Sequence, residues 1–268
     1  MSLKQEKYIS INSGKMNDLF IAINNIDSIS LSDMDNVKLL NRVDKKYLVE
    51  YNKLERIISS CTDLFFVLSV SGSKVLKYHT TYFDTDNYDL FQAHQRGCLN
   101  RYKIRYRRYI NSGDIFLEIK QKTNTGRTKK KRKKVNFCEI PFGELCSNFI
   151  TDFSGLNPSL LKPRIDTKFD RITLVSKDLK SRVTIDVNIK MMNIDNSVSI
   201  ENLSVVEVKQ ERGAGIIAMD KILREYKCVP SGFSKYCIGL SILNNTLKQN
   251  NFAPVVKMLK RNNYVKFI

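Results

Sequence analysis

Four short segments of the chain carry a polar or charged residue at every second position. These positions are Lys103, Arg105 and Arg107; Glu118, Lys120 and Lys122; Arg182, Thr184, Asp186 and Asn188; and Glu207 and Lys209. The residues between them are largely Ile, Leu and Val. Because successive side chains of a β-strand point to opposite faces of a sheet, each segment has one apolar and one ionic face.

The composition of the ionic face indicates how these strands are arranged. A sheet with one wetted face usually places Thr, Ser and Gln there, whereas this face carries Arg, Lys and Glu from residue 103 to residue 209. The simplest interpretation is an α+β fold. In it, a closed antiparallel β-barrel surrounds a lumen lined by cations and a few carboxylates, and helices cover the outside.

Turn signals and helical spacing place this barrel within the chain. Residues 111–113 read Asn-Ser-Gly, which predicts a hairpin whose two strands keep their ionic faces on the same side. Leu19, Phe20 and Ile23 recur at helical spacing ahead of the first strand. We predict an N-terminal tail and helical segment at 1–39, a barrel domain at 40–245 and a C-terminal helical extension at 246–268.

The charge balance predicts what the lumen holds. The formal net charge is +18. Two unit charges about 6 Å apart repel by roughly 3 kcal/mol at an effective dielectric constant of 20, so a lumen with many cations needs a polyvalent anion. The few carboxylates suit a divalent cation, because hard oxygen ligands select Mg²⁺ or Mn²⁺, which also bind phosphate oxygens. A phosphate chain meets both requirements.

Cysteine usage and hydropathy limit the cellular setting. The six cysteines show no C-x-x-C spacing and are accompanied by two histidines, which argues against a zinc site and favours a reduced, cytoplasmic protein. The sequence has no signal-peptide pattern at Met1 and no apolar run of the about 20 residues that span a bilayer. We therefore expect any membrane association to depend on a separate membrane-protein partner.

The basic run at 127–134 has an alternative interpretation. Seven of its eight residues are Lys or Arg, which is also typical of a nucleic-acid-binding patch. Single-stranded nucleic acid usually requires aromatic platforms between the charges, and duplex DNA a recognition helix. Tyr102, Tyr106 and Tyr109 already belong to a predicted barrel strand. A basic nucleic-acid-binding module without catalysis is thus the less favoured hypothesis.

Together, these segments resemble a known family. They are Arg42 to Tyr47, Tyr82 to Thr85, Asn100 to Tyr109, Phe116 to Lys122, Gly126 to Arg132, Phe169 to Arg171, Arg182 to Asp186, Val206 to Lys209 and Ser234 to Tyr236. In this order the chain resembles the VTC domain of polyphosphate polymerases, bacterial type, within the triphosphate tunnel metalloenzymes. The resemblance implies an eight-stranded tunnel that binds a triphosphate with a divalent cation, Mn²⁺ or Mg²⁺.

The resemblance also implies roles for individual residues. The catalytic, phosphate-holding set is Lys46, Arg105, Arg107, Lys120, Arg171, Arg182 and Lys235, joined by one basic residue among 129–132. Lys131 is chosen because it alternates with Lys129 and Lys133. Further phosphate ligands are Lys103, Lys122, Lys209 and Arg132. Glu207 is the implied metal ligand, and Glu118 is a second candidate for that role.

The predicted reaction is phosphoryl transfer. The sequence shows no catalytic triad, Cys/His pair or glycine-rich phosphate loop, and phosphoryl transfer requires mainly positioning and charge stabilisation. The favoured hypothesis is a polyphosphate polymerase-like transferase whose ligands are ATP, triphosphate and polyphosphate. If water replaces the acceptor chain, the same site is a metal-dependent triphosphatase.

Overall fold

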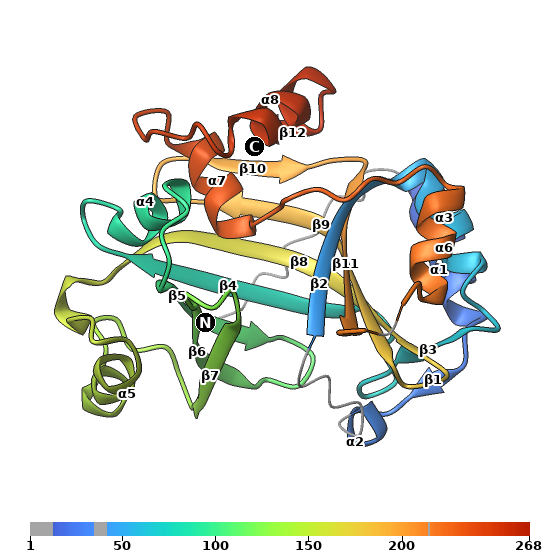
Figure 1. Ribbon diagram of the computed structural model, residues 1–268, viewed down its shortest axis with the longest axis horizontal. Helices are drawn as coiled ribbons and strands as arrows, with labels where there is room; N and C mark the ends of the chain where they lie inside the picture. The colour runs from blue at the N-terminus through green and yellow to red at the C-terminus, as the bar shows by residue number, and fades with distance from the viewer. Residues whose placement is uncertain (1–12, 35–41, 214) are drawn as a thin grey trace, which may run out of the picture.

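A strongly curved sheet with helices on its outside forms the protein (Figure 1). The computed structural model describes residues 13–34, 42–213 and 215–268. The predicted polar tail at the N-terminus therefore lies largely outside the described residues. The sheet contains 12 strands, and nearly all of its pairs are antiparallel, as the alternating segments predict.

Eight strands follow one another through antiparallel pairs from one edge of the sheet to the other. In order they are β7 (Thr128–Val135), β6 (Ile115–Lys122), β5 (Arg101–Tyr109), β4 (Leu76–Asp84), β8 (Lys162–Ser176), β9 (Ser181–Met192), β11 (Leu203–Glu211) and β2 (Arg42–Glu50). Four shorter strands extend the sheet beside β8 and β9: β1 (Ser28–Ile29), β3 (Phe65–Leu68), β10 (Ser197–Ile200) and β12 (Val265–Phe267).

The sheet does not close into the predicted eight-stranded barrel. Among the described residues, β2 pairs with β11 and β7 pairs with β6, but no pairing joins β2 to β7. An alternating pattern specifies which side chains face inward, but it contains no information on hydrogen bonds between the first and last strands. The sheet still curls far enough for side chains of both edge strands to line one cavity.

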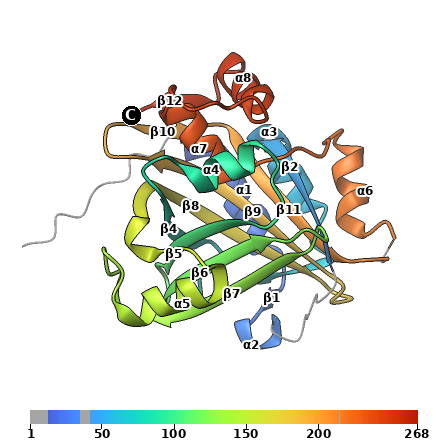
Figure 2. The ribbon, with the colours of Figure 1, turned by 60° about the vertical axis from the view of Figure 1, so that its left-hand side comes forward.

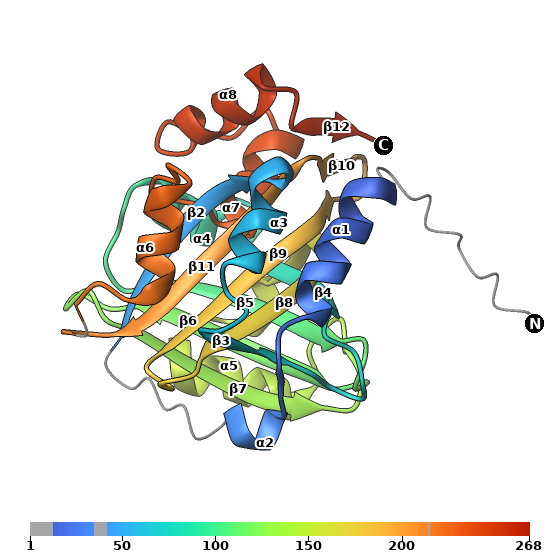
Figure 3. The same cartoon turned by 90° about the vertical axis from the view of Figure 1, so that its right-hand side faces the viewer.

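Three helices cover the outer face of β9 and β11 (Figure 3). They are α1 (Ser13–Asn24), α3 (Tyr51–Ser59) and α6 (Ala218–Glu225). Leu54 and Ile57 of α3 and Leu223 of α6 pack in one apolar cluster with Val183 and Val206 of the sheet, all of them buried. The apolar positions of the alternating segments are thus core residues, which is why only the ionic positions remain for the inner face.

A second outer layer covers β5 and β6 (Figure 2). It contains α5 (Glu144–Ser154), followed by the short 3-10 helix η1 (Pro158–Leu160). Cys146 and Ile150 of α5 are buried in one cluster with Ile104 and Leu117. The other side chains of β5 and β6, at Arg105 and Lys120 for example, therefore point into the curl of the sheet.

Helix α7 (Lys235–Leu243) is buried from Tyr236 to Leu243 and holds Lys235 at the end of the curled sheet. Its N-terminus is capped by Ser234, whose Oγ accepts the Cys237 amide at 3.3 Å. The Tyr236 hydroxyl donates to Asp84, which also accepts the Leu90 and Phe91 amides at 2.8 Å each. Asp84 therefore ties α7 to β4 and to α4 (Asp89–Gln95).

The remaining elements lie near the ends of the sheet. Helix α2 (Leu31–Met34) follows β1, and α8 (Ala253–Arg261) packs beside α7. The C-terminal segment, predicted to be helical, ends instead in strand β12, which pairs with β10. Within the described part of the chain, every helix is too short or too polar to cross a membrane.

Candidate active site

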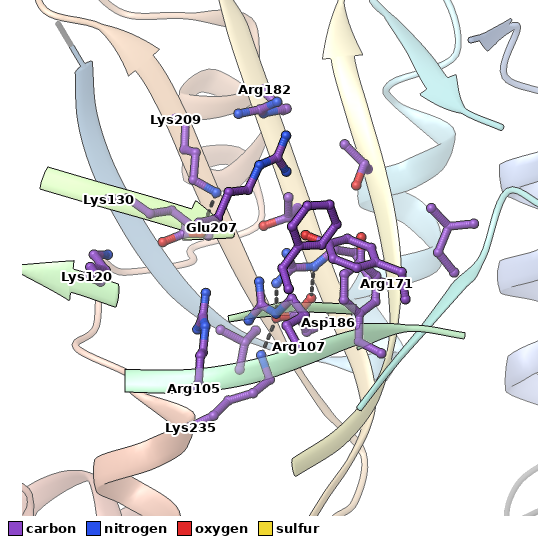
Figure 4. A pocket seen from close by; sticks show the side chains of 18 of the residues that line it. Arg105, Arg107, Lys120, Lys130, Arg171, Arg182, Asp186, Glu207, Lys209 and Lys235 are labelled. Carbon is purple, nitrogen blue, oxygen red and sulfur yellow. Dashed lines mark hydrogen bonds and ion pairs between the residues drawn. The ribbon is translucent and has the colours of Figure 1, made fainter. Parts of the chain in front are cut away.

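The curled sheet encloses a cavity of about 590 Å³, and each of the eight long strands contributes side chains to its lining. Among the described lining residues, twelve are Lys or Arg and four are Asp or Glu. This excess of positive charge at one site requires an anionic ligand of several charges. Figure 4 shows cationic side chains from separate strands and from α7 converging on this space.

Most of the residues predicted to form the site line this cavity. Those that do are Lys46, Lys103, Arg105, Arg107, Lys120, Arg132, Arg171, Arg182, Glu207, Lys209 and Lys235. Three predicted residues, Lys122, Lys131 and Glu118, are not among the residues that line it.

Lys131 lies on the outer face of β7, so the choice of this residue within the lysine run was wrong. Lys130 stands directly opposite Lys120, and Lys131 opposite the buried Ile119. Residues opposite each other in a ladder share a face. Lys130 therefore points into the cavity, whereas the Lys131 ammonium lies 5.1 Å from the centre of the Phe153 ring of α5.

Lys122 also differs from its prediction as a phosphate ligand. Its Nζ donates to the carbonyl of Gly126 in the turn between β6 and β7. The alternation places Lys122 on the correct face, but the strand ends at this residue and its side chain folds back over the hairpin. A two-residue period cannot indicate where along a strand the cavity stops.

Glu118 is buried beneath the cations and is 1% exposed. Its Oε2 accepts from Arg105 Nε at 2.8 Å and lies 3.7 Å from Arg107, while Oε1 accepts from Lys130. Burial alone would raise the pKa of Glu118, but the three positive charges outweigh it and hold the pKa well below its ordinary value. Both oxygens are engaged, so Glu118 braces cations rather than offering a metal ligand.

Asp186 of β9 has a similar bracing role. Arg171 donates to both of its oxygens, at 2.6 and 2.8 Å, and Lys235 contacts the second oxygen (Figure 4). Burial would raise the pKa of Asp186, but the charges of Arg171 and Lys235 lower it overall. The alternating segment contains Asp186, but only the fold shows that this carboxylate joins β8 to α7.

Glu207 of β11 faces the cavity between two lysines. Its Oε2 accepts from Lys209 Nζ at 2.6 Å, and its Oε1 lies 3.5 Å from Lys46 Nζ. Burial would raise the pKa of Glu207, but Lys209 and Lys46 hold it well below the ordinary value. Glu207 is therefore ionised at neutral pH and keeps part of its coordination capacity toward the cavity.

Five lining lysines have depressed pKa values, with burial as the largest cause in each: Lys103, Lys120, Lys130, Lys209 and Lys235. Burial, followed by repulsion from Lys46, lowers the pKa of Lys120 to about 7. Burial also lowers the pKa of Lys130 and of Lys235 to about 8, despite their contacts with Glu118 and Asp186. A bound anion would stabilise the charged form of each ammonium, so anion binding and protonation of these lysines are coupled.

Tyr82 and Thr184 are lining residues outside the predicted set that add hydroxyl groups to the polar surface. The Tyr82 hydroxyl accepts from Arg105 at 3.1 Å. Thr184, which stands opposite Glu207 in the ladder, is 5% exposed, and its Oγ1 has no hydrogen-bond partner among the described residues. Such an orphaned hydroxyl beside Glu207 indicates a missing polar partner in the cavity.

The donor set limits how a metal can bind. The described residues contain no group of three His, Cys, Asp or Glu side chains placed to hold a metal ion. Mg²⁺ commonly binds through one or two carboxylates, with substrate phosphates and waters as its other ligands. Glu207 and the Thr184 hydroxyl fit that mode, in which the ion arrives together with the phosphate.

Comparisons with known proteins agree with this geometry. The sequence profile of the VTC domain matches residues 41–141 and 149–244. No curated protein matches the chain by sequence. A proposed adenylate cyclase from Bacillus halodurans has a similar structure, with a TM-score of 0.51, 15% identity, and coverage of 73% of this chain and 96% of its own.

A second similar structure is that of a proposed adenylyl cyclase from Hippeastrum, described as having a dominant triphosphatase activity. The two share a TM-score of 0.51 and 12% identity, over 75% of this chain and 95% of the Hippeastrum protein. At these identities the likeness concerns the fold.

Proposed function

Since the chain belongs to the VTC domain family, we propose that its cavity binds a triphosphate and transfers the terminal phosphate of ATP to a polyphosphate chain. The observation that carries this proposal is the cluster of twelve Lys and Arg residues around one cavity with four carboxylates. A linear polyphosphate supplies negative charge along its whole length, which matches cations contributed by successive strands.

Each group of residues has a role in this reaction. Arg105, Arg107 and Arg171 hold phosphate oxygens, because a planar guanidinium can donate two hydrogen bonds at once. Glu118 and Asp186 keep these guanidinium groups in position. Glu207, with Thr184, would hold a Mg²⁺ or Mn²⁺ ion carried by the phosphates, which would neutralise charge that develops on the transferred group.

The bond changes balance without a covalent enzyme intermediate. An oxygen of the acceptor chain's end phosphate forms a bond to the terminal phosphorus of ATP, and the bond from that phosphorus to its bridging oxygen breaks. The products are ADP and a chain longer by one phosphate. The acceptor oxygen is already anionic, so no residue needs to remove a proton from it.

One feature of the site favours transfer over the alternative, hydrolysis. A triphosphatase benefits from a base that accepts a proton from water, but Glu207 and Asp186 have depressed pKa values and are poor proton acceptors. His79 and His94 do not line the cavity; they contact Asp166 and the Tyr102 carbonyl. The Lys120 amine, with a pKa lowered to about 7, lines the cavity, but a bound phosphate would keep it charged and so unable to accept a proton.

Incubation of the purified protein with ATP and Mn²⁺ or Mg²⁺ tests the proposal. We expect polyphosphate, resolved as a ladder on a gel, together with an equal amount of ADP for each phosphate added. Release of orthophosphate without polymer would instead establish the hydrolase. Tight duplex binding with neither activity would support the nucleic-acid-binding module.

A matched pair of variants tests whether the cavity is the site. Lys130→Met should weaken tripolyphosphate binding about tenfold or more, the size expected for a hydrogen bond to a charged group. Lys131→Met, one residue away on the outer face, should leave the affinity unchanged. Equal losses in both variants would indicate a general charge effect instead of a defined site. Titration calorimetry measures the tripolyphosphate affinity of each variant.

A further inference from the structure

The two ends of the cavity differ in chemistry. Lys103, Lys120 and Lys130 stand side by side across β5, β6 and β7, and they form an ammonium-rich end. At the other end of these strands the lining contains the aromatic side chains of Tyr109 and Phe116, beside Asn111, Ser112 and Asp114 of the turn between β5 and β6. A bare phosphate chain has no group that would stack on such rings.

Tyr109 and Phe116 are the two described aromatic lining residues whose rings remain partly exposed, since Tyr78, Tyr82 and Phe233 are buried. The Tyr109 and Phe116 ring centres lie 5.7 Å apart in an edge-to-face arrangement. Leu31, another lining residue of this end, is 51% exposed, so the end opens to solvent. Partly exposed rings at an open end can accept a flat aromatic ligand.

The rings adjoin the guanidinium groups. Arg132 lies 4.8 Å from the centre of the Phe116 ring. Tyr78 is 5.0 Å from Tyr109, and the guanidinium of Arg171 lies 5.0 Å from the centre of the Tyr78 ring. A surface of aromatic rings therefore lies directly beside the phosphate-binding guanidinium groups.

We propose that Tyr109 and Phe116 form a base-binding subsite, so that ATP lies with its base at this end and its phosphates directed toward the lysines. This inference rests on the proposed function and adds the orientation of the nucleotide to it. The cavity volume of about 590 Å³ falls within the range of about 300 to 1,000 Å³ typical of small-molecule sites. The acceptor chain then approaches from the ammonium-rich end, nearest the terminal phosphate.

Binding of ATP and of tripolyphosphate to Tyr109→Leu and Phe116→Leu tests the subsite. Because loss of one stacking partner weakens base binding by about tenfold, we expect ATP affinity to fall by that factor in each variant and tripolyphosphate affinity to stay within about twofold. Phe267→Leu, the same substitution at a 58% exposed ring of β12, is the control. Equal losses for both ligands, or none for either, would overturn the subsite.

A fluorescent variant provides an independent measurement. The chain contains no tryptophan, so Tyr109→Trp introduces a single probe at the proposed subsite. ATP should quench its emission by stacking, and tripolyphosphate should quench it far less. Identical responses to both ligands would contradict the inference. If the wild-type protein binds neither ligand, the proposed function itself fails, which is a different result from a lost preference for ATP.

Discussion

Glu118 and Glu207 both lie on the inner side of the curled sheet, yet their surroundings differ. Glu118 is 1% exposed and contacts three cations, whereas the Glu207 side chain is 16% exposed and contacts two lysines. Glu118 is therefore part of the scaffold that holds Arg105 and Lys130. Glu207 faces the cavity, where it can interact with a ligand.

This difference shows that a carboxylate in a cationic cavity can have one of two roles. It can hold the protein's own cations in position, or it can interact with the bound ligand. A buried ion network is costly to form, because several charges lose their hydration, and it is still more costly to break when one partner is removed. Substitution of each carboxylate by its neutral isostere separates the two roles. Substitution of Glu118 should lower the stability of the fold, and substitution of Glu207 should lower metal-dependent turnover.

The largest effect is expected on stability. Glu118→Gln leaves Arg105, Arg107 and Lys130 converging without a counter-charge, and loss of one partner from a buried ion network costs about 3–5 kcal/mol. Urea unfolding followed by circular dichroism measures the loss. Tripolyphosphate should raise the melting temperature of this variant more than that of the wild type, because the anion replaces the missing charge.

The control for Glu118→Gln is Glu211→Gln, at an exposed position of β11. It should change the free energy of unfolding by less than about 0.5 kcal/mol. A Glu118→Gln protein as stable as this control would mean that the cations do not depend on Glu118.

The second effect concerns turnover. Glu207→Gln should lower the metal-dependent rate by about a hundredfold, the size found when one charge-stabilising group is removed from an active site. It should not weaken tripolyphosphate binding in the absence of metal, because Lys46 and Lys209 are then free to bind the anion. Steady-state rates across a Mn²⁺ titration, with Glu211→Gln as the control, measure the change. An unchanged rate at every Mn²⁺ concentration would remove Glu207 from the site.

The smallest effect is a dependence on pH. Because the pKa of Lys120 lies near 7, tripolyphosphate affinity should fall a few-fold between pH 6.5 and 8.5 as the ammonium of the free protein loses its proton. The Lys120→Arg variant keeps a positive charge at this position over the whole range. Its tripolyphosphate affinity should therefore fall less than that of the wild type between pH 6.5 and 8.5. Parallel curves for the two proteins would rule out Lys120 as the titrating group.

The same shift has a consequence for stability. The unfolded chain holds its lysine protons up to an ordinary pKa of about 10.5, whereas folded, ligand-free protein releases the Lys120 proton near pH 7. The unfolded state therefore binds more protons between these values, and the ligand-free protein should become more stable as pH rises from 7 to 9. Lys120→Met should show a smaller rise in melting temperature.

Much of the site could be predicted from local patterns. Residues two apart on a strand share a face whatever the tertiary structure, so the alternation of Arg105 and Arg107 with Ile104 and Tyr106 already places the cations on one side. Ile104 and Tyr106 are buried in the cluster that contains α5, on the outer face, which agrees with the placement of Arg105 and Arg107 on the inner face. The VTC resemblance added Lys46 and Lys235, which no local pattern connects.

The lysine run shows where local information ends. Every residue at 129–134 is basic, so no apolar partner marks the outer face. A shift of one residue then exchanges Lys130 and Lys131 without any change in the pattern. Pairing of Lys130 with Lys120 removes this ambiguity, and it depends on the neighbouring strand.

The sequence by itself thus determined the strand faces, the excess of cations and the family, because these depend on residue type and on spacing along the chain. Tertiary structure alone decided that β2 and β7, as far as the structure describes them, do not pair with each other. It also decided that Glu118 and Asp186 brace cations, and that Tyr109 and Phe116 meet at one open end. Such features arise between segments far apart in the chain. Their energies depend on burial and distance, which no local pattern records.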